Sequence, residues 1–186
     1  MNDEKELIRR TLQGEKEAFE MLITKYQNSL LTYISRMTSS REMALDFTQD
    51  VFIKTYTNLH TYRPQFKFST WLFKIASNTM IDYWRKKKLD TFSIDQRHKD
   101  DDRPQFQLPD DKISIENKYE LFQIRERIED LLDILPPSHR ELFVLRHVNE
   151  FSYDEIAEIK NIPVGTVKNR VFQIKELIRK KLEKKL

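Results

Sequence analysis

Apolar residues recur at every third or fourth position through most of the chain, which is the spacing of an α-helix buried along one face. The clearest stripe follows Gly14 and predicts one long amphipathic helix; its members are Phe19, Leu22, Ile23, Tyr26, Leu30, Ile34 and Met37. Similar spacing predicts helices over residues 41–59 and 69–88, the second capped by Ser69 or Thr70. The segment between them, residues 61–68, contains a proline and several aromatics and is expected to be an ordered loop.

The second half of the chain carries the pattern of a helix-turn-helix. A helical stripe over residues 121–135 stops at Pro136-Pro137, and a new helix then carries Leu142, Phe143 and Leu145. Ser152 and Glu155 have the spacing of a capping box, with Phe151 and Ile156 placed as its hydrophobic staple. The turn residues Lys160-Asn161-Ile162-Pro163 follow, and a last helix is expected over residues 164–184.

Composition narrows the fold class to all-α. The 186 residues include only two glycines, whereas sandwiches, barrels and Rossmann-type folds need many of them in turns and phosphate-binding loops. Hydrophobic residues make up 39% of the chain, enough for one or two small domains. The absence of cysteine excludes disulfide scaffolds, thiolate zinc sites and cysteine catalysis.

The net charge of +3 averages segments of opposite sign. Residues 163–186 hold eight basic and two acidic side chains, whereas residues 90–116 hold eight acidic and four basic ones, with two prolines. We read the acidic stretch as a flexible linker between two helical domains. The predicted boundaries are 1–89 for the first domain, 90–114 for the linker and 115–186 for the second domain.

Three sets of polar residues lie on predicted helix faces. Asp46, Gln49, Asp50 and Ile53 share one face, which suits a basic protein partner, although these residues alone fit an ordinary solvated face better. A second stripe, beside Phe66, Phe68 and the basic run 85–88, could stack unpaired bases and hold a single strand; it comprises Trp71, Lys74, Asn78, Asp82 and Arg85. Any one of the aromatics Trp71, Phe73 and Trp84 is more simply explained as part of the hydrophobic core.

The last helix presents a surface suited to phosphates and base edges in a major groove; its residues are Lys168, Asn169, Arg170, Phe172 and Gln173. A simpler explanation is a helical hairpin whose basic face is merely solvated. That explanation does not account for the capping box, the hydrophobic staple, the turn residues and the basic second helix occurring together.

Two runs of motifs resemble a known family. The order Asp46-Phe47-Thr48-Gln49-Asp50-Val51-Phe52, then residues 66–72, 75–78 and 81–86, looks like sigma region 2 of the extracytoplasmic-function (ECF) RNA polymerase sigma factors of the sigma-70 family. Leu135-Pro136, then residues 151–157 and 162–170, look like their sigma region 4. Two multi-part motifs in the family's order and spacing make the resemblance specific.

The resemblance implies a role for each face. Residues expected to dock on the clamp of the largest RNA polymerase subunit are Asp46, Gln49, Asp50 and Phe52. Residues expected to recognise and open the minus-10 element are Phe66, Lys67, Phe68, Trp71, Asn78, Asp82, Arg85 and Lys86. Residues expected to read the minus-35 element as duplex are Thr166, Lys168, Asn169, Arg170, Phe172 and Gln173. Region 4 would also contact the flap of the second-largest subunit, and an anti-sigma factor, which can be membrane-anchored, would cover the polymerase-binding surfaces.

Two positions depart from the family's usual pattern. Lys160-Asn161 stands where Leu-Gly is common, and the lysine is expected to remove an apolar contact and loosen the turn. Gln173 stands where an arginine is frequent, which affects the expected base preference at the minus-35 element.

Other functions are less consistent with the sequence. A stand-alone helix-turn-helix regulator would share the second domain but would not need the Asp46–Phe52 motif or the aromatic loop. No third carboxylate or histidine joins Asp46 and Asp50, and the four histidines lack ligand spacing, so we expect no metal, cofactor, small-molecule substrate or enzymatic activity. The first six residues do not resemble a signal peptide and no apolar run approaches ~20 residues, so we expect a soluble cytoplasmic protein.

Overall fold

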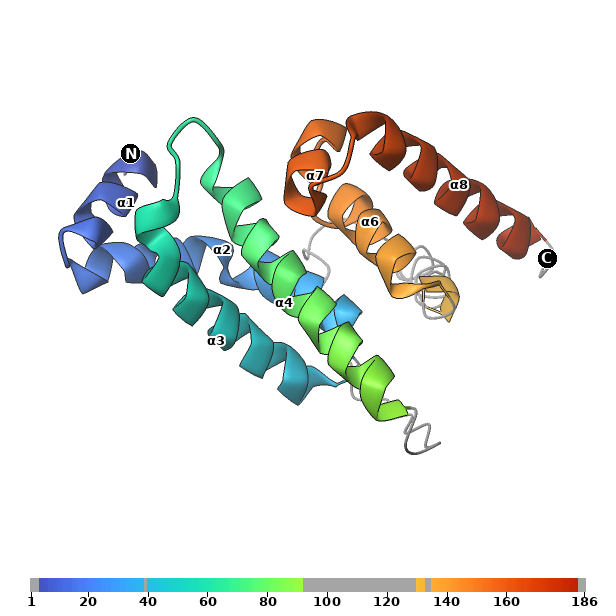
Figure 1. Cartoon of the computed structure of the whole chain (residues 1–186), viewed down its shortest axis with the longest axis horizontal. Coiled ribbons are helices and arrows are strands. Elements are labelled where there is room, and N and C mark those ends of the chain that lie inside the picture. Colours follow the sequence, from blue (N-terminus) through green and yellow to red (C-terminus); the bar gives the residue numbers. More distant parts are fainter. Residues whose placement is uncertain (1–3, 39, 92–129, 133–134, 184–186) are drawn as a thin grey trace, which may run out of the picture.

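The described residues of the first half form a bundle of four α-helices. The computed structural model describes residues 4–38, 40–91, 130–132 and 135–183. The helices of the first half, coloured blue to green in Figure 1, are α1 (Glu4–Leu12), α2 (Lys16–Met37), α3 (Arg41–Asn58), the short 3-10 helix η1 (Leu59–Thr61) and α4 (Phe68–Thr91). The bundle is held by buried residues that include Leu22, Leu30, Val51 and Leu72.

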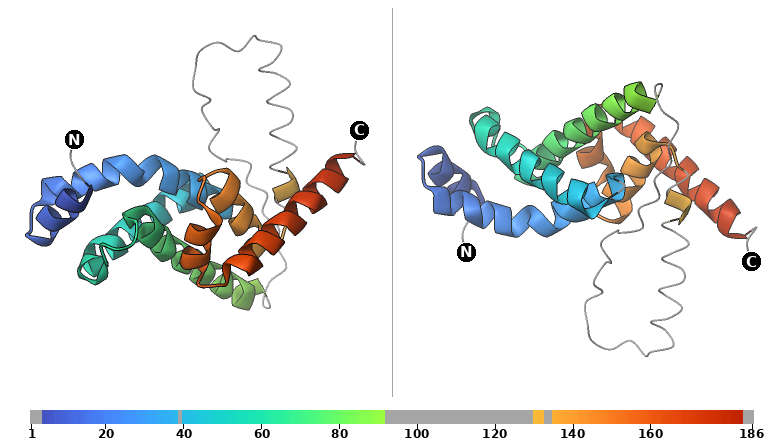
Figure 2. Two further views of the ribbon diagram at one scale, coloured as in Figure 1. Left: turned by 90° about the horizontal axis from the view of Figure 1, so that it is seen from above. Right: turned by 90° about the horizontal axis from the view of Figure 1, so that it is seen from below.

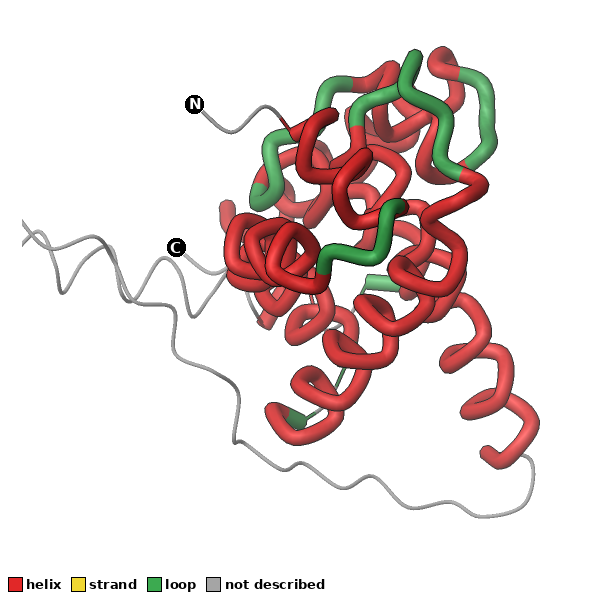
Figure 3. The backbone as a smooth tube through the Cα atoms, turned by 90° about the vertical axis from the view of Figure 1, so that its left-hand side faces the viewer, coloured by secondary structure: helices red, strands yellow, loops and turns green. Residues whose placement is uncertain are grey.

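Residues 137–183 of the second half form the three helices drawn orange to red in Figure 1. They are α6 (Pro137–His147), α7 (Tyr153–Lys160) and α8 (Val164–Glu183). Within the described ranges every regular element is helical, as Figure 3 shows, so the predicted all-α fold is confirmed. The predicted acidic linker and most of the 121–135 stripe lie outside the described residues.

Local sequence signals set most helix ends. Ser40 caps α3, its hydroxyl accepting a hydrogen bond from the Met43 backbone N–H at 3.2 Å. Gly14 adopts φ +94°, which ends α1 in a conformation that residues with a Cβ rarely adopt. The cap predicted for α4 is wrong, because Ser69 and Thr70 lie inside its first turn: the helix begins at Phe68 and the Trp71 N–H bonds the Lys67 carbonyl at 3.2 Å.

The two halves pack directly against each other. Helix α7 lies against α4, and α6 lies against α2. Phe151, just before α7, meets Phe73 of α4 edge-on with ring centroids 4.7 Å apart. Helix α8 lies on the side away from the first half, and its C-terminal end projects from the body in both views of Figure 2. The fold therefore leaves the outer face of α8 open.

The capping box gives a first stability prediction. We expect Ser152→Ala to lower the free energy of unfolding by ~1 kcal/mol, because the Glu155 N–H at the start of α7 loses its acceptor. Ser69→Ala, also a serine near a helix start but not a cap, is the matched control and should leave the melting temperature unchanged. Thermal unfolding followed by circular dichroism measures both, and equal melting temperatures for the two variants would contradict the cap assignment.

Candidate nucleic-acid and protein interfaces

The first helix of the helix-turn-helix, α7, begins with the predicted capping box. The Ser152 hydroxyl accepts from the Glu155 N–H at 3.2 Å, and Glu155 Oε2 accepts from the Ser152 N–H at 2.8 Å. Phe151 and Ile156, the predicted staple, are both buried. These contacts are all local, so the sequence itself fixes where α7 begins.

The turn between α7 and α8 uses a left-handed residue. Asn161 has φ 51° and ψ 48°, a conformation that asparagine tolerates better than most residues. The Ile162 N–H bonds the Ala157 carbonyl at 3.1 Å and closes the end of α7. Lys160, which was expected to loosen this turn, has a side chain that is only 11% exposed and forms an ion pair with Glu141 of α6.

The outer face of α8 carries the residues predicted for duplex DNA. Val167, Val171 and Ile174 face inward and are buried, which fixes the rotation of the helix. Lys168, Asn169, Arg170, Phe172 and Gln173 are exposed, and Thr166 is half-buried. Phe172 is 63% exposed, so its ring is accessible on this face.

The loop between η1 and α4, together with Phe68 at the start of α4, forms a cluster of aromatic rings that we call the aromatic platform. Phe68 is only 1% exposed and packs against the rings of Tyr26 and Tyr62, at centroid distances of 5.5 and 5.6 Å. The Tyr62 hydroxyl donates to the Phe66 carbonyl at 2.6 Å, which holds the loop closed. Phe66 itself is 43% exposed at the surface. Phe68 therefore cannot contact DNA directly in this conformation, because it forms the base of the platform.

One surface of α4 continues from this loop. Lys74, Asn78, Asp82, Arg85 and Lys86 are exposed, whereas Trp71 is half-buried against Tyr62 at 5.5 Å. Arg85 and Asp82 form an exposed ion pair at 3.3 Å, one turn apart. The structure thus brings the predicted minus-10 residues, Phe68 excepted, onto one continuous surface.

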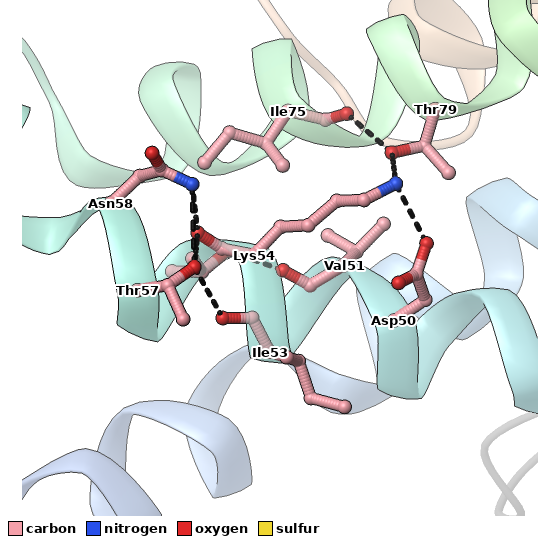
Figure 4. A network of polar contacts seen from close by, with 9 residues as sticks. Asp50, Val51, Ile53, Lys54, Thr57, Asn58, Ile75 and Thr79 are labelled. Carbon is pink, nitrogen blue, oxygen red and sulfur yellow. Dashed lines mark hydrogen bonds and ion pairs between the residues drawn. The ribbon is translucent and has the colours of Figure 1, made fainter.

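The acidic face of α3 is held by a lysine that the sequence analysis missed. Lys54 Nζ lies 2.7 Å from Asp50 Oδ2 and donates to Thr79 Oγ1 of α4 at 3.2 Å, as Figure 4 shows. Thr79 in turn donates to the Ile75 carbonyl at 3.0 Å. Lys54 therefore orients Asp50 and ties the acidic face to α4. The spacing of four residues between Asp50 and Lys54 is the sequence signal that could have predicted this ion pair.

The rest of the α3 face is partly apolar. Asp46 and Gln49 are exposed, but Phe52 is 8% exposed and faces the core, so it cannot be a direct contact in this conformation. Ile53 is 56% exposed and Leu45 is 48% exposed on the same helix. Acidic groups beside exposed aliphatic ones are typical of a protein-binding surface.

Among residues 4–38, 40–91, 130–132 and 135–183, no three His, Cys, Asp or Glu side chains lie where they could hold a metal ion. In the same part of the chain, none of the helices is long and apolar enough to cross a membrane.

The geometry defines a two-part helical protein with an exposed basic face on α8 and a separate surface around the loop before α4. Comparison with known proteins identifies both parts: residues 22–89 match the model of sigma-70 region 2, and residues 125–178 match that of sigma-70 region 4. The chain is 33% identical over 179 residues to the ECF RNA polymerase sigma factor SigW of Bacillus subtilis (strain 168), covering 96% of each chain. It is 31% identical over 185 residues to the ECF RNA polymerase sigma-E factor of Escherichia coli (strain K12), covering 95% of this chain and 93% of that one.

Solved structures share the fold. CnrH, solved in complex with the cytosolic domain of CnrY, has a TM-score of 0.68 at 21% identity, covering 95% of each chain. The sigma factor RpoE of Bartonella quintana, solved with the anti-sigma factor NepR, has a TM-score of 0.68 at 20% identity, covering 89% of this chain and 96% of that one. The chain belongs to the ECF RNA polymerase sigma factors, whose members are transcription initiation factors rather than enzymes.

Proposed function

We propose that this sigma factor binds core RNA polymerase through α3, opens the minus-10 element with α4 and the preceding loop, and reads the minus-35 element with α8. The main support for the proposal is that one chain presents three separate surfaces. They are an acidic and apolar face on α3, an aromatic and basic surface on α4 and the preceding loop, and a basic face on α8. A stand-alone regulator would need only the surface on α8.

The polymerase contact rests on charge and apolar area together. Asp46, Gln49 and the oriented carboxylate of Asp50 would meet basic groups of the clamp of the largest subunit, and Ile53 would add apolar contact beside them. Phe52 would support the helix from the core side. The second half would contact the flap of the second-largest subunit.

The minus-10 contact rests on the aromatic platform. Separating a base from its stack costs a few kcal/mol, and stacking of a base on an aromatic ring returns ~1–3 kcal/mol. Phe66 is the exposed ring for such stacking, with Lys67 beside it for the backbone. Asn78, Asp82, Arg85 and Lys86 continue the surface along α4, while Phe68 and Trp71 support it.

Two further properties follow from the family. We propose that the chain has no catalytic centre of its own and acts in the cytoplasm, where core polymerase and promoter DNA are found. We also propose control by an anti-sigma factor, because the fold is shared with CnrH, solved with the cytosolic domain of CnrY, and with RpoE, solved with the anti-sigma factor NepR.

Size-exclusion chromatography with purified bacterial core RNA polymerase tests the proposal. We expect the chain to co-elute with the polymerase in one-to-one ratio at moderate and high salt. A chain that binds duplex DNA but never co-elutes would be a stand-alone regulator, and the proposal would be wrong.

The minus-35 assignment gives a second prediction. Arg170→Ala should weaken binding to the cognate minus-35 duplex by ~1–3 kcal/mol, because an exposed arginine in the second turn of α8 can make a bidentate contact with a guanine. Fluorescence anisotropy with cognate and scrambled duplexes measures the effect. Lys180→Ala, at the far end of α8, is the control. An equal loss on both duplexes would mean that Arg170 contacts phosphate only.

A further inference from the structure

Helix α1 reaches the aromatic platform through the carboxylate of Glu4. Glu4 Oε1 accepts a hydrogen bond from the Tyr26 hydroxyl of α2, and Lys25 Nζ lies 2.6 Å from the same oxygen. Helix α1 also packs against η1, so it lies at the end of the bundle that carries the loop before α4 (Figure 1). Because α1 precedes residues 22–89, the part matched to sigma-70 region 2, the roles proposed above do not include this contact.

A series of ring contacts leads from Glu4 to the exposed ring of Phe66. The Tyr26 ring lies 5.5 Å from the Phe68 ring, and the Phe68 ring lies 5.6 Å from the Tyr62 ring, centroid to centroid. The Tyr62 hydroxyl donates to the Phe66 carbonyl at 2.6 Å. Because each ring packs against the one before it, a shift of Tyr26 displaces the backbone of the loop.

Other contacts fix α1 on the bundle. Leu7 and Ile8 are buried, and α1 packs along α2. Arg10 and Glu15 form an ion pair at 2.7 Å across the turn that joins the two helices. The carboxylate of Glu4 therefore approaches the platform from a fixed direction.

The hydroxyl of Tyr26 needs an acceptor at this position. Burial, and after it the hydrogen bond to Glu4 and the charge of Glu4, raise the pKa of the Tyr26 phenol, so the group keeps the proton that it donates. A half-buried hydroxyl without an acceptor costs free energy, and Tyr26 would regain a partner by turning toward water and away from Phe68. Lys25 offsets the charge of Glu4, so the hydrogen bond is the main effect of the carboxylate on the platform.

We propose that Glu4 is a positioning residue for the loop before α4: through Tyr26 it holds the aromatic platform in the conformation that turns Phe66 outward. A single strand then meets a ring that is already in place, and binding does not have to order the loop. The part of this inference that concerns DNA rests on the proposed function, but the support of the platform by α1 does not.

Tryptophan fluorescence tests the support of the platform without DNA. The chain contains two tryptophans, so Trp84→Phe leaves Trp71, whose ring lies 5.5 Å from that of Tyr62, as the reporter. In this background we expect Glu4→Ala to raise the quenching of Trp71 by acrylamide, because the rings around it loosen. Glu4→Gln keeps an acceptor oxygen for the Tyr26 hydroxyl and should leave the quenching unchanged.

Glu6→Ala is the matched control. Glu6 lies in the same first turn of α1, and its carboxylate pairs with Arg9 of that helix at 2.6 Å. The two alanine variants therefore lose the same charge near the N-terminus of α1. Equal quenching in Glu4→Ala and Glu6→Ala would overturn the support of the platform by Glu4.

A second substitution tests the path through Tyr26. Tyr26→Phe removes the hydroxyl and keeps the ring against Phe68. Removal of both partners of a hydrogen bond leaves no polar group unsatisfied, so Tyr26→Phe in the Glu4→Ala background should return the quenching toward that of the wild-type residues. A general loosening of α1 would not be rescued in this way. Quenching that stays raised in the double variant would overturn the path.

Fluorescence anisotropy with mixed-sequence DNA tests the consequence for binding. We expect Glu4→Ala to bind a single strand about threefold to tenfold more weakly than Glu4→Gln, which has the same charge, since this is the scale of one net hydrogen bond. Binding of a duplex, which is assigned to α8, should be equal in the two variants.

Three results of this measurement would overturn the positioning role. They are an equal loss on both probes, unchanged single-strand binding by a variant whose quenching is raised, and equally tighter single-strand binding by Glu4→Ala and Glu4→Gln, which would mean that only the charge of Glu4 matters. A wild-type chain that binds no single strand, with quenching as expected, would refute the proposed function of the loop and leave the support of the platform by α1 standing.

Discussion

Reversing two charges on α3, by Asp46→Lys together with Asp50→Lys, should weaken binding to core RNA polymerase by about 100-fold or more. Like charges brought face to face at an interface cost several kcal/mol, and each 1.4 kcal/mol is about tenfold in affinity. The Asp50 carboxylate also loses its ion pair with Lys54, so the spectrum of the variant must be compared with that of the wild-type sequence. Titration of labelled chain with core polymerase measures the affinity.

The control for this experiment makes the same change in net charge elsewhere. Glu17 and Glu20 are exposed on a different helix, α2, and their reversal to lysine should leave polymerase affinity nearly unchanged. Equal losses in the two double variants would mean that net charge, and not the α3 face, governs binding. No loss in either would refute the clamp assignment.

The largest stability effect is expected at Phe73. Its ring is 2% exposed and packs against Tyr33 and Phe151, so Phe73→Ala removes contacts within the first half and between the halves. We expect the free energy of unfolding to fall by ~3–5 kcal/mol, the usual cost of emptying a buried aromatic site. Urea unfolding followed by circular dichroism measures the loss.

Phe172→Ala is the matched control for Phe73→Ala. The same atoms are removed from a ring that is 63% exposed on α8, so stability should change by less than ~0.5 kcal/mol. Comparable losses in both variants would contradict the assignment of Phe73 to the shared core. The same Phe172→Ala protein also serves to probe the outer face of α8 with duplex DNA.

Features determined by nearby residues were predictable from the sequence. The capping box at Ser152, the left-handed Asn161 and the inward-facing Val167 and Val171 all depend on neighbours within one or two helical turns. The helical period likewise predicted the exposed residues of α8, because burial of one face of a helix exposes the other.

Features determined by distant residues were not predictable. The sequence pattern does not reveal that Tyr26 and Tyr62 bury Phe68, since these rings come from two other segments. Lys160 was expected to loosen a turn because it removes an apolar contact, and its ion-pair partner Glu141 could not be foreseen because it lies on a different helix. Packing between segments, which has no short-range sequence signal, decided each of these outcomes.

Transcription in vitro tests the central claim most directly. Core polymerase from the bacterium that encodes the chain would be incubated with fragmented genomic DNA, with and without the purified chain, and the 5′ ends of the transcripts sequenced. We predict new start sites that depend on the chain and share two upstream sequence elements. Identical start sites with and without the chain, in a mixture where a known sigma factor directs transcription normally, would contradict the claim.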